Sequence, residues 1–461
     1  MASPSRYVIR GAWLLSQDPE VGEMRTADIL IEDNRIAAVA PDLGPLDAHT
    51  IDGTDRIALP GLVDTHRHTW QSLIRHMSTD WTLPQYFSGV RGVLGKAYEP
   101  EDMYAANLIG VLDALDSGIT TLVDWSHNNN TPEHADAALQ AVVDSGIRAV
   151  WAYGNSNDEW LPVSDVPQSR DVVRIKEEWF SATGGRVTLA LAPRGPQFAT
   201  KEVTLHDFDL AKELDIPVTV HVGDGAWGKS LPVLWMDEHG LATDRVTYVH
   251  GNMLSDQEYD VIARTGGAIS CAPELEMHMG HGRLSTLRAR DRGIPVSISV
   301  DVCTSVGGDL FSAMRAMLAG SRYLVNVAAL DAGEVVDPLP LTAVEVLDFA
   351  TQGGATAAWM GDQVGSITPG KRADVILLRT DVYGMSPMNY PAGAVVESGN
   401  PNLVETVFVD GELVKHDGRL LHHDFSKVRA QAEQARDRVL DRAGVKDPGH
   451  WQPSVYAPPA G

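Results

Sequence analysis

Eight short apolar stretches in the middle of the chain alternate with segments of helical character. Near-continuous apolar runs of this kind are typical of strands in a parallel sheet that helices cover on both faces. The stretches are residues 58–66, 120–125, 148–154, 187–193, 217–223, 245–251, 267–273 and 295–301. Eight strand–helix units predict an α/β fold of the (β/α)8, or TIM, barrel type.

The two ends of the chain follow a different pattern. Residues 6–58 alternate short β-rich runs with turns, and similar runs return at 373–381 and 403–418. Asp33-Asn34 and Asp410-Gly411 have the composition of hairpin turns between such runs. We therefore expect one small β-sandwich domain that is built from both ends of the chain and flanks the barrel.

Helix starts support this organisation. Ser255 with Glu258, and Thr342 with Glu345, fit the capping box, in which a hydroxyl and a carboxylate three residues apart cap the first turn. The charged segment 424–443 predicts a terminal helix that packs on the barrel. The expected division is residues 1–58 and 366–420 for the two parts of the β-sandwich, 59–365 for the barrel, and 421–461 for a C-terminal helix and tail.

Composition and charge narrow the possible partners. The 461 residues are 44% hydrophobic and 21% charged, which is an ordinary globular mixture, and the formal net charge is −25. This acidity argues against nucleic acid and anionic membranes, because both attract positive surfaces. The two cysteines, Cys271 and Cys303, exclude a disulfide scaffold and suit a reducing compartment. Without a signal-peptide pattern or a long apolar span, the sequence predicts a cytoplasmic protein that acts on a small molecule.

Histidine and aspartate follow four of the predicted barrel strands. His66 and His68 end the first strand, His221 the fifth, His250 the sixth and Asp301 the eighth. Residues two apart on a strand face the same side, so both imidazoles of the first strand would face the barrel mouth. Barrel active sites form where the carboxyl ends of several strands meet, and imidazole is a common zinc or iron ligand. One such histidine would indicate only a hydrogen-bonded structural residue, whereas four strand ends together predict a metal site.

These residues resemble a known family. The segment Pro60-Gly-Leu-Val-Asp-Thr-His-Arg-His68, with the later histidines and aspartate, is similar to the amidohydrolase superfamily. More narrowly it resembles the deaminase and chlorohydrolase branch, which includes S-adenosylhomocysteine, guanine and cytosine deaminases and triazine hydrolases. Residues 370–374 and 409–411 are similar to the family's returning sandwich strands, so the resemblance covers nearly the whole chain.

The resemblance implies one divalent metal ion per subunit, with Zn²⁺ as the first choice and Fe²⁺ as the alternative. Two-metal members of the superfamily bridge their ions with a lysine on the fourth strand, and residues 187–193 contain no lysine. The implied ligands are His66, His68, His221 and Asp301.

The resemblance also implies a reaction. Zn²⁺ lowers the pKa of its bound water from 15.7 to about 7, and the resulting hydroxide can attack an sp² carbon. His250 would orient or polarise the water or the substrate. Asp224 stands where many deaminases have a glutamate that shuttles protons, and Asp224 or Asp301 would protonate the leaving amine. The predicted activity is hydrolytic deamination of an amino-substituted nitrogen heterocycle, at a C–N bond other than a peptide bond.

The segment after the seventh strand departs from the family pattern. Many deaminases have Ser-Asn-x-Lys-Leu there, whereas this chain has Ala-Pro-Glu-Leu-Glu-Met-His-Met-Gly-His at 272–281. Residues of this segment, and others that follow the first two strands, are predicted substrate contacts. They are Trp70, Gln71, Trp125, His127, Glu274, Glu276, His278 and His281.

Two alternatives stay open at this point. The departure after the seventh strand and the short Asp224 side chain also suit hydrolysis of an amide, a cyclic amide or a chloro-substituted heterocycle at the same site. A non-catalytic binding or assembly protein on this fold is the third reading, although such proteins commonly lose metal ligands. The family also leads us to expect a homo-oligomer.

Overall fold

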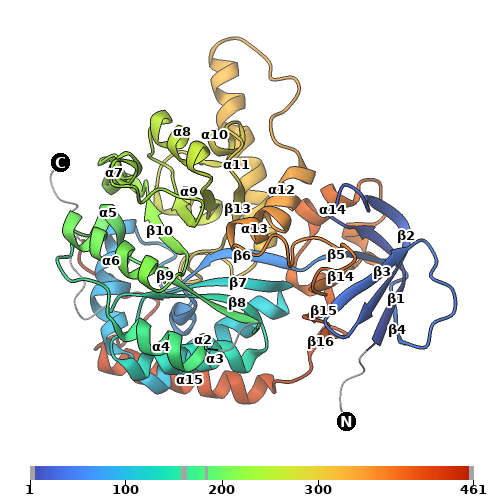
Figure 1. Cartoon of the computed structure of the whole chain (residues 1–461), viewed down its shortest axis with the longest axis horizontal. Helices are drawn as coiled ribbons and strands as arrows, with labels where there is room; N and C mark the ends of the chain where they lie inside the picture. Colours follow the sequence, from blue (N-terminus) through green and yellow to red (C-terminus); the bar gives the residue numbers. More distant parts are fainter. Residues whose placement is uncertain (1–5, 157–162, 182–184, 456–461) are drawn as a thin grey trace.

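Eight parallel strands form the central sheet of the computed structural model, which describes residues 6–156, 163–181 and 185–455 (Figure 1). Its strands pair in sequence order from β6 to β13, and the outer two meet where Arg67 bridges to Asp301. The predicted (β/α)8 barrel is therefore confirmed. Its strands are β6 (Leu62–Arg67), β7 (Ile119–Ser126), β8 (Arg148–Gly154), β9 (Val187–Ala192), β10 (Val218–Val222), β11 (Val246–His250), β12 (Ala268–Cys271) and β13 (Val296–Ile298).

A second, mixed sheet joins the two ends of the chain, as predicted. Its order is β17-β16-β15-β14-β5-β1-β2-β3, with β4 also paired to β1. Asp33-Asn34 connects β2 to β3, and Asp410-Gly411 connects β15 to β16. The strands are β1 (Arg6–Leu15), β2 (Glu23–Glu32), β3 (Arg35–Ala40), β4 (His49–Asp52), β5 (Arg56–Pro60), β14 (Val375–Arg379), β15 (Val404–Val409), β16 (Glu412–His416) and β17 (Arg419–Leu420).

The predicted first barrel strand, residues 58–66, belongs to two strands. Residues 56–60 form β5 in the second sheet, and the chain enters the barrel only at Leu62. Gly61 makes the passage possible, because a Cβ at this position would lie 1.9 Å from Oγ1 of Thr120. The residues are buried in both sheets, so the apolar pattern of the sequence does not change where the chain passes from the second sheet into the barrel.

Helices cover the barrel on its outer side (Figure 1). Both predicted capping boxes are present, at Ser255 before α8 and at Thr342 before α12. Among the described residues, no helix combines the length and the apolar character that crossing a membrane requires. The helices are α1 (Leu83–Tyr86), α2 (Pro100–Asp116), α3 (Pro132–Ser145), α4 (Asp171–Trp179), α5 (Gly195–Phe198), α6 (Lys201–Glu213), α7 (Pro232–Glu238), α8 (Asp256–Thr265), α9 (Pro273–Met279), α10 (Thr286–Arg290), α11 (Leu310–Asp331), α12 (Ala343–Phe349), α13 (Gln352–Ala357), α14 (Pro391–Ser398) and α15 (Phe425–Arg442).

Short helical turns complete the connections between these elements. They are η1 (Thr69–Ile74), η2 (Phe87–Leu94), η3 (Gly95–Ala97), η4 (Gly225–Lys229), η5 (Tyr383–Met385) and η6 (Pro401–Leu403). The predicted terminal helix is α15, which packs on α2. Arg438 and Arg442 of α15 both bond the buried carboxylate of Asp102 on α2, so a buried charge is neutralised at this contact.

A buried ion pair ties the barrel to the second sheet. Arg148, at the start of β8, donates to Asp374 at 2.9 and 3.0 Å and to Asp410 at 2.9 Å. Replacing Arg148 with alanine would leave the buried Asp374 without its guanidinium partner, so we expect the free energy of unfolding to fall by about 3–5 kcal/mol. Denaturant unfolding measures this change.

The matched control is Arg170→Ala, which removes an ion pair with Glu213 whose side chains are 59% and 54% exposed. Exposed pairs are worth about 0–1 kcal/mol, so this variant should unfold close to the wild type. Equal losses in the two variants would contradict the structural role assigned to Arg148.

Candidate metal centre

Five histidine and aspartate side chains meet at the carboxyl end of the barrel, and each comes from a strand or from the residues just after it. His66 lies in β6, His221 in β10 and His250 at the end of β11. His68 directly follows β6, and Asp301 follows β13. Because parallel strands point the same way, their carboxyl ends form one rim, and barrel closure brings β6 next to β13.

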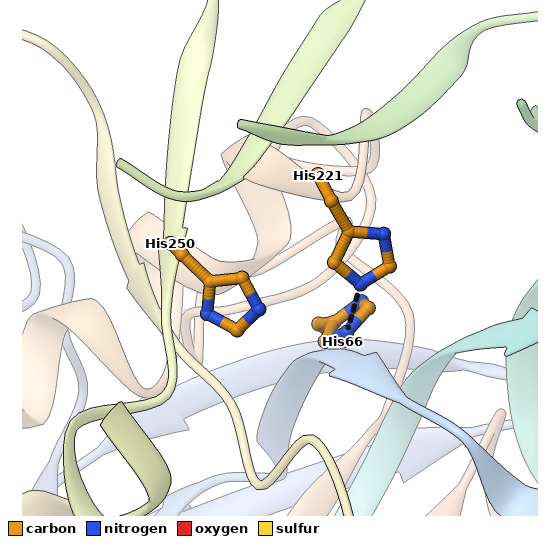
Figure 2. A group of neighbouring side chains, drawn as sticks. All are labelled: His66, His221 and His250. Carbon is orange, nitrogen blue, oxygen red and sulfur yellow. Dashed lines mark hydrogen bonds between the residues drawn. The ribbon is translucent and has the colours of Figure 1, made fainter. Parts of the chain in front are cut away.

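Distances between the side-chain atoms show how tightly this cluster is built. Nε2 of His66 lies 3.2 Å from Nε2 of His221, and the two rings point toward one another in Figure 2. Oδ1 of Asp301 lies 3.3 Å from Nε2 of His66 and 3.4 Å from Nε2 of His68. The structure therefore brings the four predicted ligands together.

The protonation states of these groups suit metal binding. Burial, reinforced by the neighbouring imidazoles, holds the pKa of His68 and of His221 well below the usual value, so both rings are neutral at pH 7. Burial by itself raises the pKa of Asp301, but the imidazoles of His66 and His250 outweigh it and keep the carboxyl ionised. Neutral imidazole and ionised carboxylate are the forms that coordinate a cation.

Two further observations fit a divalent ion at this place. Nδ1 of His68 lies 2.9 Å from the carbonyl oxygen of Trp125, which holds the ring proton on Nδ1 and leaves the Nε2 lone pair facing the cluster. Nε2 of His66 and Nε2 of His221 face one another at 3.2 Å, so both nitrogens are placed where one cation could contact them. His66, His68 and Asp301 form one group of donor atoms that could hold a divalent metal, and His66 and His221 belong to a second such group with His250.

The backbone is strained at two of these positions. His250 has φ of 75° and Asp301 has φ of 65°, in the left-handed region that side chains other than glycine rarely adopt. Strain of this kind costs about 1–3 kcal/mol per residue and is typical of functional sites. It aims the His250 and Asp301 side chains into the barrel mouth.

His250 is held beside the cluster by three carboxylates. Its Nδ1 lies 3.2 Å from the buried Glu276 on α9, and its Nε2 lies 3.5 Å from both Asp224 and Asp301. Burial by itself lowers the pKa of His250. The charge of Asp224 and the hydrogen bond to Glu276 outweigh burial and raise the pKa to about 9, so the ring is cationic at pH 7.

Asp224 presents one carboxylate oxygen to the same space. Its Oδ2 accepts a hydrogen bond from Gln197 at 3.2 Å, and its backbone N–H donates to the same side chain. Oδ1 is buried, lies 3.2 Å from Nδ1 of His281, and makes no hydrogen bond within the described part of the chain. An oriented but unbonded buried oxygen can accept a proton from a ligand or donate one to it.

His68, His221, His250, Asp224 and Asp301 line one pocket. Its lining combines polar and charged side chains with aromatic and aliphatic ones. The lining residues are His68, Leu83, Tyr86, Phe87, Arg91, Trp125, His127, Asn155, Arg194, Phe198, His221, Asp224, His250, Leu275, Met279, His281, Asp301 and Val302.

Comparison with known proteins decides the family. The profile of the amidohydrolase family matches residues 57–414, which include both sheets' central strands and every member of the cluster. The chain belongs to the amidohydrolase family. This agrees with the resemblance seen in the sequence.

Curated relatives of this amidohydrolase align over nearly its full length. A protein named 5'-deoxyadenosine deaminase from Methanothermobacter thermautotrophicus is 30% identical over 437 residues, which cover 92% of this chain and 97% of that protein. One named 5-methylthioadenosine/S-adenosylhomocysteine deaminase from Desulforudis audaxviator is 29% identical and covers 95% and 99%.

Solved structures agree. Atrazine chlorohydrolase from Arthrobacter aurescens TC1 complexed with zinc is 25% identical, has a TM-score of 0.82 and covers 93% of this chain and all of that one. A zinc-bound adenosine deaminase from Xanthomonas campestris has a TM-score of 0.80 at 23% identity, which shows a shared fold.

The predicted substrate contacts of this amidohydrolase divide into two groups. Trp125, His127 and His281 line the pocket, and His127 stacks on His68 with ring centroids 3.8 Å apart. Trp70 and Gln71 lie one layer behind the lining, where they bond His127 and Tyr86.

The three other predicted contacts lie on α9, and none of them lines the pocket. Glu276 is fully buried and bonds His250, whereas Glu274 is half-buried outside the pocket lining. His278 is exposed and bonds the carbonyl oxygen of Thr79. The structure therefore does not bring Glu274 or His278 into the pocket.

Several lining residues were not predicted from the sequence. Asn155 directly follows β8 and Arg194 follows β9, so the strand-end criterion that selected the candidate metal ligands could have found both. Tyr86 and Arg91 come from the long connection between β6 and α2, where no periodic signal marks which side chains turn inward.

Proposed function

We propose that this amidohydrolase is a zinc-dependent deaminase that hydrolyses the exocyclic C–N bond of an amino-substituted nitrogen heterocycle, with adenine nucleosides as the first substrates to test. The observation that carries the proposal is the buried group formed by Asp224, His250 and Asp301, which lines one pocket together with the imidazoles of His68 and His221. The names of the curated relatives support the choice of adenine nucleosides.

His66, His68, His221 and Asp301 would hold the ion, for which zinc is the first choice because related structures contain it. When bound, such an ion lowers the pKa of water so that attack on an sp² carbon can occur at neutral pH. The hydrogen bond from His68 to the Trp125 carbonyl fixes the orientation of one ligand before the ion arrives.

The charged side chains around the ion would accept and donate the protons that the reaction moves. Asp301 is ionised and can accept a proton on the oxygen that is not shared with His66. His250, kept cationic by Glu276 and Asp224, can donate a hydrogen bond to the oxygen that adds to the ring carbon, where negative charge develops. The C–N bond breaks only when the amine leaves protonated, as ammonia.

Asp224 is the proposed proton carrier to this amine: it would take up the proton that Asp301 receives from the attacking water, pass it to the nitrogen and so return to the carboxylate form. Its free Oδ1 is buried in the pocket wall, and His281 lies 3.2 Å away on the pocket side. Because aspartate is one methylene shorter than the glutamate common in deaminases, the His281 imidazole extends the reach of the carboxylate toward a substrate.

Hydrolysis at a carbon that bears chloride is the second candidate function. It is favoured by the likeness to atrazine chlorohydrolase, which covers both chains almost completely at 25% identity. Chloride leaves without protonation, so this reaction would need Asp301 and the ion but not Asp224.

Incubation with a panel of substrates separates the two functions. We expect ammonia from at least one of adenosine, 5'-deoxyadenosine, 5'-methylthioadenosine and S-adenosylhomocysteine, with the corresponding hypoxanthine product. The panel extends to guanine, cytosine, pterins and amino- and chloro-triazines. Release of chloride without ammonia would favour the second function over the first. If no compound gave either ammonia or chloride, both functions would be contradicted.

Metal removal gives a further expected result. Dialysis against a chelator should abolish ammonia release, and titration with Zn²⁺ should restore it with an end point near one ion per chain, because the two groups that contain the predicted ligands share His66 and so cannot hold separate ions. Elemental analysis of the restored protein measures the ratio. An end point near two ions, with both required, would contradict the single site.

A further inference from the structure

Gln197 contacts Asp224 through both ends of its side-chain amide. Nε2 of Gln197 donates to Oδ2 of Asp224 at 3.2 Å, and Oε1 accepts from the backbone N–H of Asp224, also at 3.2 Å. The chemistry of the partners fixes the direction of the amide, because a backbone N–H can only donate and so requires Oε1 opposite it. The two residues are 6% and 3% exposed, so little water competes for these bonds.

Gln197 reaches Asp224 because the chain turns sharply after β9. Gly195 has φ of 68°, and a Cβ at this position would lie 2.3 Å from Cγ2 of Val220 on β10. Glycine therefore lets the short helix α5 approach β10, the strand that Asp224 follows. Gln197 is the third residue of α5, and its amide meets the chain just beyond the end of β10.

The backbone around Asp224 is held independently of Gln197. The carbonyl oxygen of Asp224 accepts from the amide of Gly228 at 3.0 Å, and the amide of Gly225 donates to the carbonyl oxygen of His281 at 2.9 Å. With the backbone held, the carboxylate can still rotate about its last bond, whose torsion is broad and roughly two-fold. Within the described part of the chain, the bond from Gln197 is the hydrogen bond that restricts this rotation.

This restriction makes the two oxygens of Asp224 unequal. Oδ2 accepts the N–H of Gln197, whereas Oδ1 lies 3.2 Å from Nδ1 of His281 and 3.5 Å from Nε2 of His250. Oδ1 is therefore the oxygen that faces the two pocket histidines. A neutral amide suits the other side of the carboxylate, because a basic side chain there would neutralise its charge and an acidic one would repel it.

We propose that Gln197 is a positioning residue for deamination, which holds Asp224 so that Oδ1 faces the pocket and can pass a proton to the leaving amine. This role rests on the proposed function, in which Asp224 takes up a proton that the attacking water supplies and returns to the carboxylate as ammonia leaves. Gln197 is not among the described residues that line the pocket, so it acts on the reaction through Asp224.

Gln197→Leu tests this role, since leucine fills a similar volume and forms neither hydrogen bond. We expect kcat for ammonia release to fall roughly 10- to 100-fold, with KM and bound zinc close to the wild-type values, because only the orientation of one group is lost. The double variant Gln197→Leu/Asp224→Asn should be no slower than Asp224→Asn alone, since both changes act on the same carboxylate.

The matched control is Gln140→Leu, which removes another hydrogen bond between an amide and a carboxylate, from Gln140 to the exposed Asp144 on α3. This variant should keep the wild-type kcat. Wild-type kcat in Gln197→Leu, loss of its bound zinc, or a further slowing of Asp224→Asn by the second substitution would each overturn the proposal.

Hydrogen exchange gives a second readout that does not depend on activity. The backbone amide of Asp224 should exchange roughly fivefold faster in Gln197→Leu than in the wild type, because its bond to Oε1 is lost. Unchanged exchange would overturn the orienting contact itself. A wild type that releases no ammonia, but whose Asp224 amide responds as expected, would contradict the proposed function while confirming the contact.

Discussion

Asp301→Asn should lower kcat for ammonia release by roughly 10²- to 10⁴-fold and should also weaken metal binding. The asparagine has almost the same shape, but it carries no charge to attract the cation and cannot accept a proton at neutral pH. Oδ1 of the carboxylate it replaces lies within 3.4 Å of Nε2 of His66 and of His68, so both effects arise from one carboxylate group. Steady-state kinetics and elemental analysis of the same preparation measure them together.

The control for this variant is Asp209→Asn, which changes an exposed carboxylate on α6 and should leave kcat and metal content as in the wild type. Retention of full activity by Asp301→Asn would contradict the proposed centre. Loss of activity in both variants would show that the assay reports general damage to the protein.

Asp224→Asn should also lower kcat by roughly 10²- to 10⁴-fold, but with metal content unchanged. Asp224 touches none of the four proposed ligands at the distances seen here, and its charge acts on His250 and His281. The amide can neither donate the proton that the amine requires nor help to keep His250 cationic. Separate measurement of kcat and of bound zinc distinguishes this variant from Asp301→Asn.

Asp224→Glu provides the conservative comparison, because it keeps the carboxylate and changes only its reach. It should retain more activity than Asp224→Asn for an amino substrate. If Asp224→Asn hydrolysed a chloro-substituted substrate at the wild-type rate while failing on the amino analogue, protonation of the amine would be established as its function. Equal activity of Asp224→Asn and the wild type on amino substrates would exclude the residue as the donor.

The barrel and its metal cluster could be predicted from the sequence because one physical relation links them. A buried parallel strand is a near-continuous apolar run, and a histidine or aspartate at the carboxyl end of such a run lies at the rim of the barrel. His66, His221, His250 and Asp301 all satisfy this relation. The apolar pattern does not show where a buried run passes from one sheet to another. For this reason the sequence predicts one strand over residues 58–66, where the structure has β5 and β6.

Substrate contacts were harder to predict because distance along the chain does not determine where a side chain points. Trp70 and Gln71 follow the metal histidines directly, yet η1 turns them behind the pocket lining, where they support His127 and Tyr86. Glu276 and His278 are two residues apart on α9, which places them on different sides of the helix. One holds His250 and the other faces solvent.

The seam at which the barrel ring closes lies beside the metal cluster. β6 and β13 meet through the bridge between Arg67 and Asp301, through the amide of Val300 on Asp64, and through Thr65 on the carbonyl of Ile298. His66 and His68 stand on one margin of this seam and Asp301 on the other, so an ion held by these three groups would join the two margins. Its affinity for the folded chain would then add to the stability of the barrel, and the cation would stabilise the fold as well as take part in the reaction.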